Sequence, residues 1–187
     1  MAVPTTMTTL NISGKYTQNK SLSDNTDEIL RLQGVGLLVR KALGMATLYV
    51  TINHLNEDGV ETISMEQKLT GGLGSSNEDR VLNWEETSVE NKLFGPTISK
   101  TRRAKPEDLE EIYLKEGWSE ATKEHGIIHI LNKSDTEKSK NTWIIEGAWG
   151  IEEVGGEPRY VRHVYFTGPK GEEIRARMVF DYRECFT

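Results

Sequence analysis

The sequence predicts a mainly β protein: a closed antiparallel β-barrel of about nine to ten strands, with a two-helix lid and one inserted helix. Three observations lead to this prediction. A short strand-like opening at residues 14–17 runs into two brief helical patterns broken at Gly34–Gly36. From Thr47 onward the apolar residues alternate with a period of two, as in half-buried strands. Glycine-rich turns then separate several more strand patterns, which is typical of barrels.

The predicted lid covers residues 24–43. Its first helix begins near Ser23 or Asp24, whose side chains can accept hydrogen bonds from the free N–H groups of a first turn. Its second helix places Leu38 on an apolar side together with its helical neighbours, and Gly44 suits the C-terminal stop. We expect the lid to cover one open end of the barrel.

A β-hairpin follows the lid, with its turn at Asp58–Gly59 and with Met65 on the apolar face of the return strand. Pro106 and helical spacing of apolar residues predict the inserted helix over 105–118, which would cover a barrel opening or form a dimer contact. The remaining strands are expected near residues 80–86, 95–101, 126–131, 142–152, 159–166 and 173–183.

Length and composition favour a single domain over residues 1–187, with 1–12 flexible. The net charge of −6 argues against nucleic acid as a partner. No apolar run reaches the roughly 20 residues of a membrane span, and the N-terminus lacks the features of a signal peptide, so we expect a cytoplasmic protein. Cys185 is the single cysteine, which excludes a disulfide framework.

Seven segments carry a family resemblance. The order GKY, SLSDNTDEIL, LQGVGLLVRKA and TLYVTINH resembles the opening of the intracellular fatty-acid-binding proteins, in the calycin (lipocalin-like) superfamily. The later pieces EETSVENKLFGPTISKTRR, EEIYLKEGW and EGAWGIEEVGGEPRYVRHV look more like a group of fungal calycin-like proteins. The resemblance implies a barrel that holds a hydrophobic small molecule.

The predicted ligand-binding residues are mainly large apolar side chains expected to line the cavity. The alternative is that they simply fill the barrel as core. The fatty-acid binders anchor a carboxylate with an Arg-x-Tyr pair on the final strand, and this sequence contains no such pair, which favours a neutral, polycyclic or aromatic ligand. The candidates are Trp84, Trp143, Trp149, Met65, Phe180, Tyr182 and Leu38.

Catalysis would need titratable groups that face the cavity. The candidates, if the protein is an enzyme, are His129, His163, Tyr165 and Glu146. Each histidine has a plainer interpretation as a hydrogen-bonded structural residue, and the alternation of its strand places Glu146 on the solvent side. No nucleotide-, metal- or hydrolase-type motif is present, so we expect no metal and no cofactor.

Two functions follow. The first is a barrel that binds a hydrophobic small molecule, lipid or polycyclic metabolite, in its interior. The alternative is a cofactor-free cyclase or isomerase that acts on a hydrophobic fungal natural-product intermediate in the same cavity. A barrel filled by its own side chains, acting through its surface, is a third possibility. A homodimer is compatible with each of them.

Overall fold

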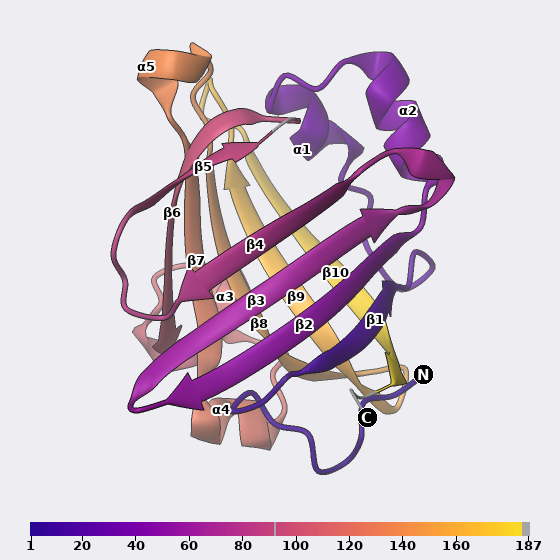
Figure 1. The fold of residues 1–187 in the computed structure, drawn as a ribbon, viewed down its shortest axis with the longest axis vertical. Helices are drawn as coiled ribbons and strands as arrows, with labels where there is room; N and C mark the ends of the chain where they lie inside the picture. Colours follow the sequence, from indigo (N-terminus) through magenta and orange to yellow (C-terminus); the bar gives the residue numbers. More distant parts are fainter. Residues whose placement is uncertain (92, 185–187) are drawn as a thin grey trace.

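Ten antiparallel strands form one curled sheet in the computed structural model, which describes residues 1–91 and 93–184 (Figure 1). This confirms the predicted mainly β, barrel-like fold class. Cys185 lies outside the described residues. The strands are β1 (Gly14–Gln18), β2 (Leu48–Glu57), β3 (Val60–Leu69), β4 (Ser75–Val81), β5 (Thr87–Asn91), β6 (Gly95–Ala104), β7 (Ile127–Ser134), β8 (Ile144–Val154), β9 (Glu157–Thr167) and β10 (Glu173–Glu184).

The curled sheet has a seam. The strand order is β4-β3-β2-β1-β10-β9-β8-β7-β6-β5, so β4 and β5 are its two ends and no ladder joins them in the described residues. Residues 82–86, which were predicted as strand, instead leave β4 and cross to β6. There the Trp84 N–H donates to the Thr101 carbonyl at 2.9 Å, and Asn83 forms a bridge with Arg102. Residues 82–86 and the side chains around them therefore cover the opening between β4 and β6.

Two short helices, α1 (Asp27–Leu32) and α2 (Leu37–Met45), stand over one end of the barrel (Figure 1). Ile29 and Leu32 of α1 are buried against Trp143, Phe166 and Ala176 on the inner face of the sheet. By contrast α2 buries none of its residues, and it continues through Gly44, which was expected to end it. Leu38 is 84% exposed, so α2 does not carry the predicted inward apolar face.

The inserted segment forms short pieces rather than one helix over 105–118. A 3₁₀ turn (Pro106–Asp108), α3 (Ile112–Lys115) and α4 (Glu120–His125) follow one another. Leu109, Leu114 and Trp118 pack on the outer face of the sheet against residues of β7, β8, β9 and β10. The segment therefore thickens the barrel wall. A further short helix, α5 (Thr136–Ser139), was not predicted.

Residues 1–12 run beneath the barrel, where Val3, Thr9 and Ile12 are buried and the Val3 N–H donates to the Pro158 carbonyl. Burial and a hydrogen bond do not measure motion, so the flexibility expected for residues 1–12 stays a prediction. Among the described residues, no helix is both long and apolar enough to cross a membrane.

Close contact of α4 with β8 makes Gly150 sensitive to substitution. A Cβ at Gly150 would lie 2.7 Å from Thr122 Cγ2 and 2.9 Å from the Trp118 ring. We expect Gly150→Ala to lower the free energy of unfolding by about 1–3 kcal/mol, because overpacking displaces neighbouring groups. Gly44→Ala is the control: nothing lies within 4 Å of its Cβ position, and alanine favours a helix interior. Urea unfolding of both variants tests this; equal stabilities would contradict it.

Candidate functional site

The inner face of the sheet is identified by its register. Cross-strand partners place Met65 beside Glu78, Ile128 beside Trp149, and Trp149 beside Arg162. Because side chains alternate along a strand, these positions share the concave face. The lower half of this face is filled by an apolar core in which Tyr16, Tyr160 and Phe180 pack ring against ring, with centroids 5.0–5.4 Å apart. The core forms the floor of the barrel.

Two arginines lie on this floor. The Arg162 guanidinium lies 4.1 Å from the centre of the Trp149 ring, and its Nε donates to the Tyr160 hydroxyl at 3.0 Å. Arg80 reaches across the seam from β4 to β6, where Nη1 donates to Ser99 Oγ at 2.7 Å and Thr101 Oγ1 at 2.8 Å. Both side chains are buried, at 7% residue exposure each. They are the only cationic side chains among the fully buried residues of the described chain.

The charges on this floor do not balance. Glu78 forms an ion pair with Arg80. Among the described residues, the contacts of Arg162 are the Tyr160 hydroxyl, the Met65 sulfur and three aromatic rings, with no carboxylate. Burial lowers the pKa of Arg80, opposed by Glu78 and reinforced by the nearby charge of Arg162. One positive charge in excess, held away from water, favours an anionic or electron-rich group beside Arg162.

One guanidinium N–H is also without a partner. Arg80 Nε is buried and makes no hydrogen bond in the described structure. Most buried polar atoms in proteins are hydrogen-bonded, and leaving one unpaired costs about 1–3 kcal/mol. Together with the excess charge, this donor suits the floor to an acceptor oxygen.

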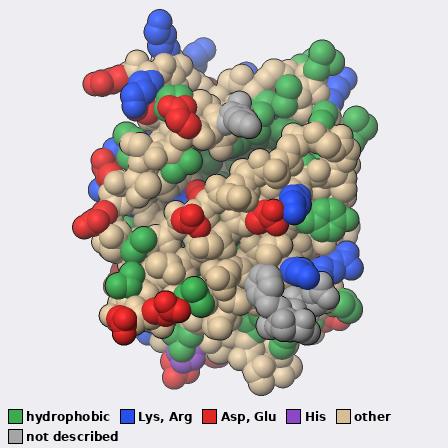
Figure 2. All heavy atoms as spheres, viewed as in Figure 1, with side chains coloured by type: hydrophobic (Ala, Val, Ile, Leu, Met, Phe, Trp, Pro, Cys, Tyr) green, Lys and Arg blue, Asp and Glu red, His purple; other side chains and the backbone are tan. Residues whose placement is uncertain are grey.

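Above the floor the interior is not filled. Inward-facing side chains nearer the lid keep part of their surface exposed, among them Gln67, Glu78, Asn132, Val164 and Met178. Figure 2 shows a hollow between β4 and the helices of the lid, in which hydrophobic side chains gather. The interior thus combines walls of apolar and polar side chains, an open upper part and a cationic floor.

The predicted ligand-binding residues fall into two groups. Met65, Trp149, Phe180 and Tyr182 lie on or beside the inner core. Trp143 is buried under α1, with its ring 6.2 Å from that of Phe94 and its indole N–H unpaired. The other two candidates do not face the interior: Trp84 lies on the outer face of the sheet, and Leu38 is exposed on α2.

The predicted catalytic residues all lie on the outer face. His129 Nδ1 accepts from Arg102, and its Nε2 lies 2.8 Å from Glu146. His163 is enclosed between the Tyr113 and Trp118 rings, with Nε2 2.9 Å from Glu152 Oε2. Tyr165 stacks under the Arg175 guanidinium at 4.9 Å. The structure therefore brings His129 and Glu146 together, a contact that the sequence did not predict, on the face away from the barrel interior.

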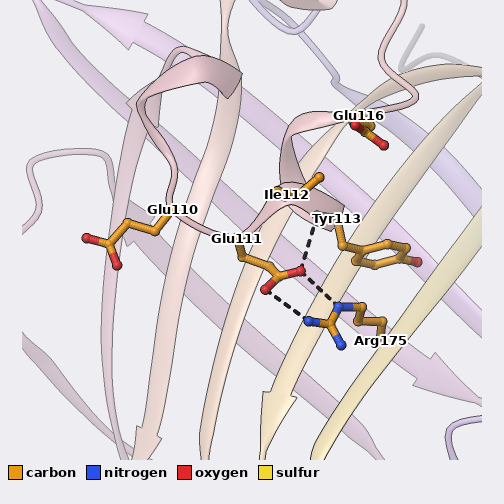
Figure 3. A pocket seen from close by; sticks show the side chains of 6 residues that line it. All are labelled: Glu110, Glu111, Ile112, Tyr113, Glu116 and Arg175. Atoms are coloured by element: carbon orange, nitrogen blue, oxygen red, sulfur yellow. Dashed lines mark hydrogen bonds and ion pairs between the residues drawn. The ribbon is translucent and has the colours of Figure 1, made fainter.

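Two of the hollows of the described structure open on the outside of the barrel. One, of about 460 Å³, lies beside α3 and is shown in Figure 3; Arg175 there is paired with Glu111 at 2.8 Å, and Glu110 and Glu116 add acidic charge. The other, of about 590 Å³, lies at the lid end between the end of α1 and the β9–β10 turn. Neither has a buried cation, so the floor of the barrel is the better site for an acceptor oxygen. In the described residues no group of three or more His, Cys, Asp or Glu side chains is placed to hold a metal ion.

A second charged cluster closes the lower end of the seam. Arg103 of β6 forms an ion pair with Glu61 of β3, and also donates to the carbonyls of Thr9 and His125. His54 lies 2.8 Å from the same Glu61 carboxylate. Burial raises the pKa of Glu61, but the hydrogen bonds and charges of His54 and Arg103 outweigh it and lower the pKa to about 2.

This cluster predicts an acid-sensitive seam. Because the pKa of Glu61 in the folded protein lies below its ordinary value of 4.5, its stabilisation is complete above pH 4.5 and is lost as the pH falls towards 2. We expect a loss of about 1–2 kcal/mol over this range, discounted for partial exposure. Unfolding measured at pH 5 and pH 3 should show a smaller drop in Glu61→Gln than in the wild type. Identical drops would contradict the assignment.

Comparison with solved structures shows that the fold is that of fatty-acid-binding and lipid-binding proteins. The lipid binding protein 8 of Caenorhabditis elegans matches with a TM-score of 0.58 at 13% identity, over 91% of this chain and 94% of that one. A fatty acid binding protein of Schistosoma mansoni, solved with arachidonic acid, matches with a TM-score of 0.57 at 15% identity, over 94% and 99%. The protein thus has the barrel fold of these fatty-acid-binding proteins, as the resemblance of its opening segments led us to expect.

Comparison of sequences identifies the family to which the chain belongs. The chain is 32% identical to the probable pericyclase scpY of Mollisia scopiformis, over 97% of this chain and 94% of that protein. It is 27% identical to the pericyclase pydY of an Acremonium species, over 97% of both. The chain therefore belongs to the family of these fungal proteins. No family model matches the sequence.

Sequence reasoning missed the arginine pair and Tyr160. A signal was present: Tyr160 and Arg162 are two residues apart, so they share a strand face, in the reverse order of the Arg-x-Tyr pair that was sought. Arg80 gave no such signal, because its role depends on β6, which contacts it only across the seam.

Proposed function

We propose that this protein is a cofactor-free pericyclase: it binds a hydrophobic, unsaturated molecule inside the barrel and speeds its closure into a ring. The observation that carries the proposal is the buried Arg162–Trp149 pair, in which a cation without a carboxylate partner in the described residues lies among aromatic rings. The relationship to two fungal proteins named as pericyclases supports it. A pericyclic ring closure redistributes electrons within one molecule, so the product is an isomer and atoms balance without a co-reactant.

Each part of the interior has a role in this proposal. The apolar walls hold the flexible substrate in a folded conformer in which the reacting carbons lie close together, which removes part of the entropic barrier. Arg162, and the free Nε donor of Arg80, bind a carbonyl or acidic oxygen conjugated with a reacting double bond. Hydrogen bonds that strengthen as charge develops on that oxygen lower the barrier further, and one such donor contributes about 2.7–4 kcal/mol in well-studied cases.

The test uses the natural precursor. Deletion of the gene in its host should cause an uncyclised compound to accumulate, and the purified protein should convert that compound into a product of identical mass with one more ring. A compound that is bound and released unchanged would contradict the enzyme proposal and would leave a carrier, the other function expected from the sequence.

A pair of fluorescent probes tests the binding site without the precursor. The probes 1-anilinonaphthalene-8-sulfonate and N-phenyl-1-naphthylamine share their ring system, but only the first is anionic. We expect both to bind in the barrel, and the anionic probe to bind more tightly, because it places its sulfonate near Arg162. Equal affinities would contradict the role of the floor cations.

A further inference from the structure

Trp84 occupies an unusual place in the fold. It is the tip of the segment that crosses from β4 to β6, and its backbone has φ = 63°, a left-handed conformation that is rare and costly for a large side chain. Such strain persists only where the surroundings hold the residue firmly. The other non-glycine residues with positive φ in the described chain, Asp58 and Lys140, are polar residues in loops or turns.

The outer face of the sheet supplies the contacts that hold it. The Trp84 ring stacks on His129, with centroids 4.9 Å apart and planes at 26°, and the Arg102 guanidinium lies 4.3 Å from its centre. Arg102 donates to His129, which in turn contacts Glu146. A continuous set of contacts therefore runs from β8 through β7 and β6 to the crossing segment.

One residue connects this outer stack to the interior. The Thr101 carbonyl accepts from the Trp84 N–H at 2.9 Å, and the Thr101 hydroxyl accepts from Arg80 Nη1 at 2.8 Å. Thr101 is buried, at 3% exposure. Arg80 lies four positions before Trp84 on the same chain. The contacts that fix Trp84 against β6 therefore also fix the distance between the Arg80 backbone and β6, which the Arg80 side chain must span.

We propose that Trp84 is a positioning residue for Arg80: its stack on His129 and Arg102 fixes the β4–β6 seam and so holds the Arg80 guanidinium on the barrel floor. The effect of Trp84 on ligand binding rests on the proposed function, whereas its effect on the position of the Arg80 guanidinium does not. This arrangement also gives a role to three residues that the sequence suggested for ligand binding or catalysis, Trp84, His129 and Glu146, which lie on the outer face of the sheet.

The experiment compares Trp84→Ala and Trp84→Phe with the wild type. The phenylalanine variant keeps a ring for stacking, so it should rescue what alanine loses. Tyr49→Ala is the control, because Tyr49 is another half-exposed aromatic residue, on β2 and away from the seam. Two readouts are measured on the full chain: hydrogen exchange of the Arg80 guanidinium by nitrogen-15 NMR, and the dissociation constants of the two naphthalene probes.

We expect Trp84→Ala to speed the exchange of the Arg80 protons at least tenfold, and to weaken the anionic probe about tenfold while leaving the neutral probe within twofold. Trp84→Phe should restore most of the slow Arg80 exchange and most of the affinity for the anionic probe. Tyr49→Ala should change neither the exchange rate nor the affinity. Unchanged Arg80 exchange in Trp84→Ala would overturn the inference, as would an equal loss of both probes, which indicates general opening of the barrel.

The outcomes also separate this inference from the proposed function. If the wild type shows no preference for the anionic probe, the proposed role of the floor cations fails, while faster Arg80 exchange in Trp84→Ala still supports the positioning role. If the preference is present and Arg80 exchange does not respond to Trp84→Ala, the positioning role fails alone.

Discussion

Arg162→Met should lower turnover of the precursor about 100-fold while the protein remains folded. Loss of a charged hydrogen bond to an acceptor oxygen costs about 1.5–3 kcal/mol, and about 2.7 kcal/mol corresponds to a factor of 100 in rate. The free energy of unfolding should change by no more than about 1–3 kcal/mol. Arg162 has no carboxylate partner in the described residues and methionine fills a similar volume among the rings it touches, whereas the buried Tyr160 hydroxyl loses its donor.

Arg175→Met is the matched control for this substitution. Arg175 also lies over an aromatic ring, that of Tyr165, but on the outer face beside the smaller hollow. We expect its turnover and its affinity for the anionic probe to equal those of the wild type. If Arg175→Met lost activity while Arg162→Met kept it, the site would lie on the outer face and the interior assignment would be wrong.

Of the substitutions proposed for this protein, Trp149→Ala should lower the free energy of unfolding the most. Trp149 is buried, and its ring supports both floor arginines, with guanidinium carbons 4.1 and 5.6 Å from its centre. Truncation of a buried tryptophan costs about 3–5 kcal/mol, because apolar contacts are lost and a cavity remains. Urea unfolding monitored by circular dichroism measures this. Trp149→Phe retains a ring and should lose less than half as much.

The same variant should affect the two probes alike. With the indole removed, the floor on which the naphthalene rings rest is lost, so Trp149→Ala should weaken the neutral and the anionic probe by a similar factor. Arg162→Met should weaken only the anionic one. A Trp149→Ala protein as stable as the wild type, or one with unchanged binding of the neutral probe, would show that Trp149 is not part of the floor.

The strand pattern could be predicted from the sequence because alternation depends on local chemistry. Trp143, Ile145, Gly147 and Trp149 alternate with Glu146, and the structure places Glu146 on the opposite face from Trp149. The exceptions have physical reasons. Residues 82–86 look like a strand but include Trp84, whose positive φ ends the extended conformation and turns the chain across the seam.

The site could be predicted only in part. The place of Met65 and Phe180 in the inner core follows from alternation, whereas that of the arginines depends on long-range pairing. Arg80 is recognised as part of the floor only when β4 and β6 face each other across a seam that carries no ladder. The histidines drew attention because of their intrinsic pKa, yet the outer cover of α3 and Trp118 explains the burial of His163 without any ligand.

The central claim is that the precursor binds inside the barrel, and the most direct test is to locate the bound precursor. The methyl group of Met65 and the indole N–H of Trp149 can each be followed by NMR, and both belong to the inner face. We predict nuclear Overhauser contacts from the bound precursor to both groups, and a shift of the Arg162 guanidinium resonances. Contacts to Tyr113 and Ile112 on the outer face, with the Met65 and Trp149 resonances unmoved, would contradict the account.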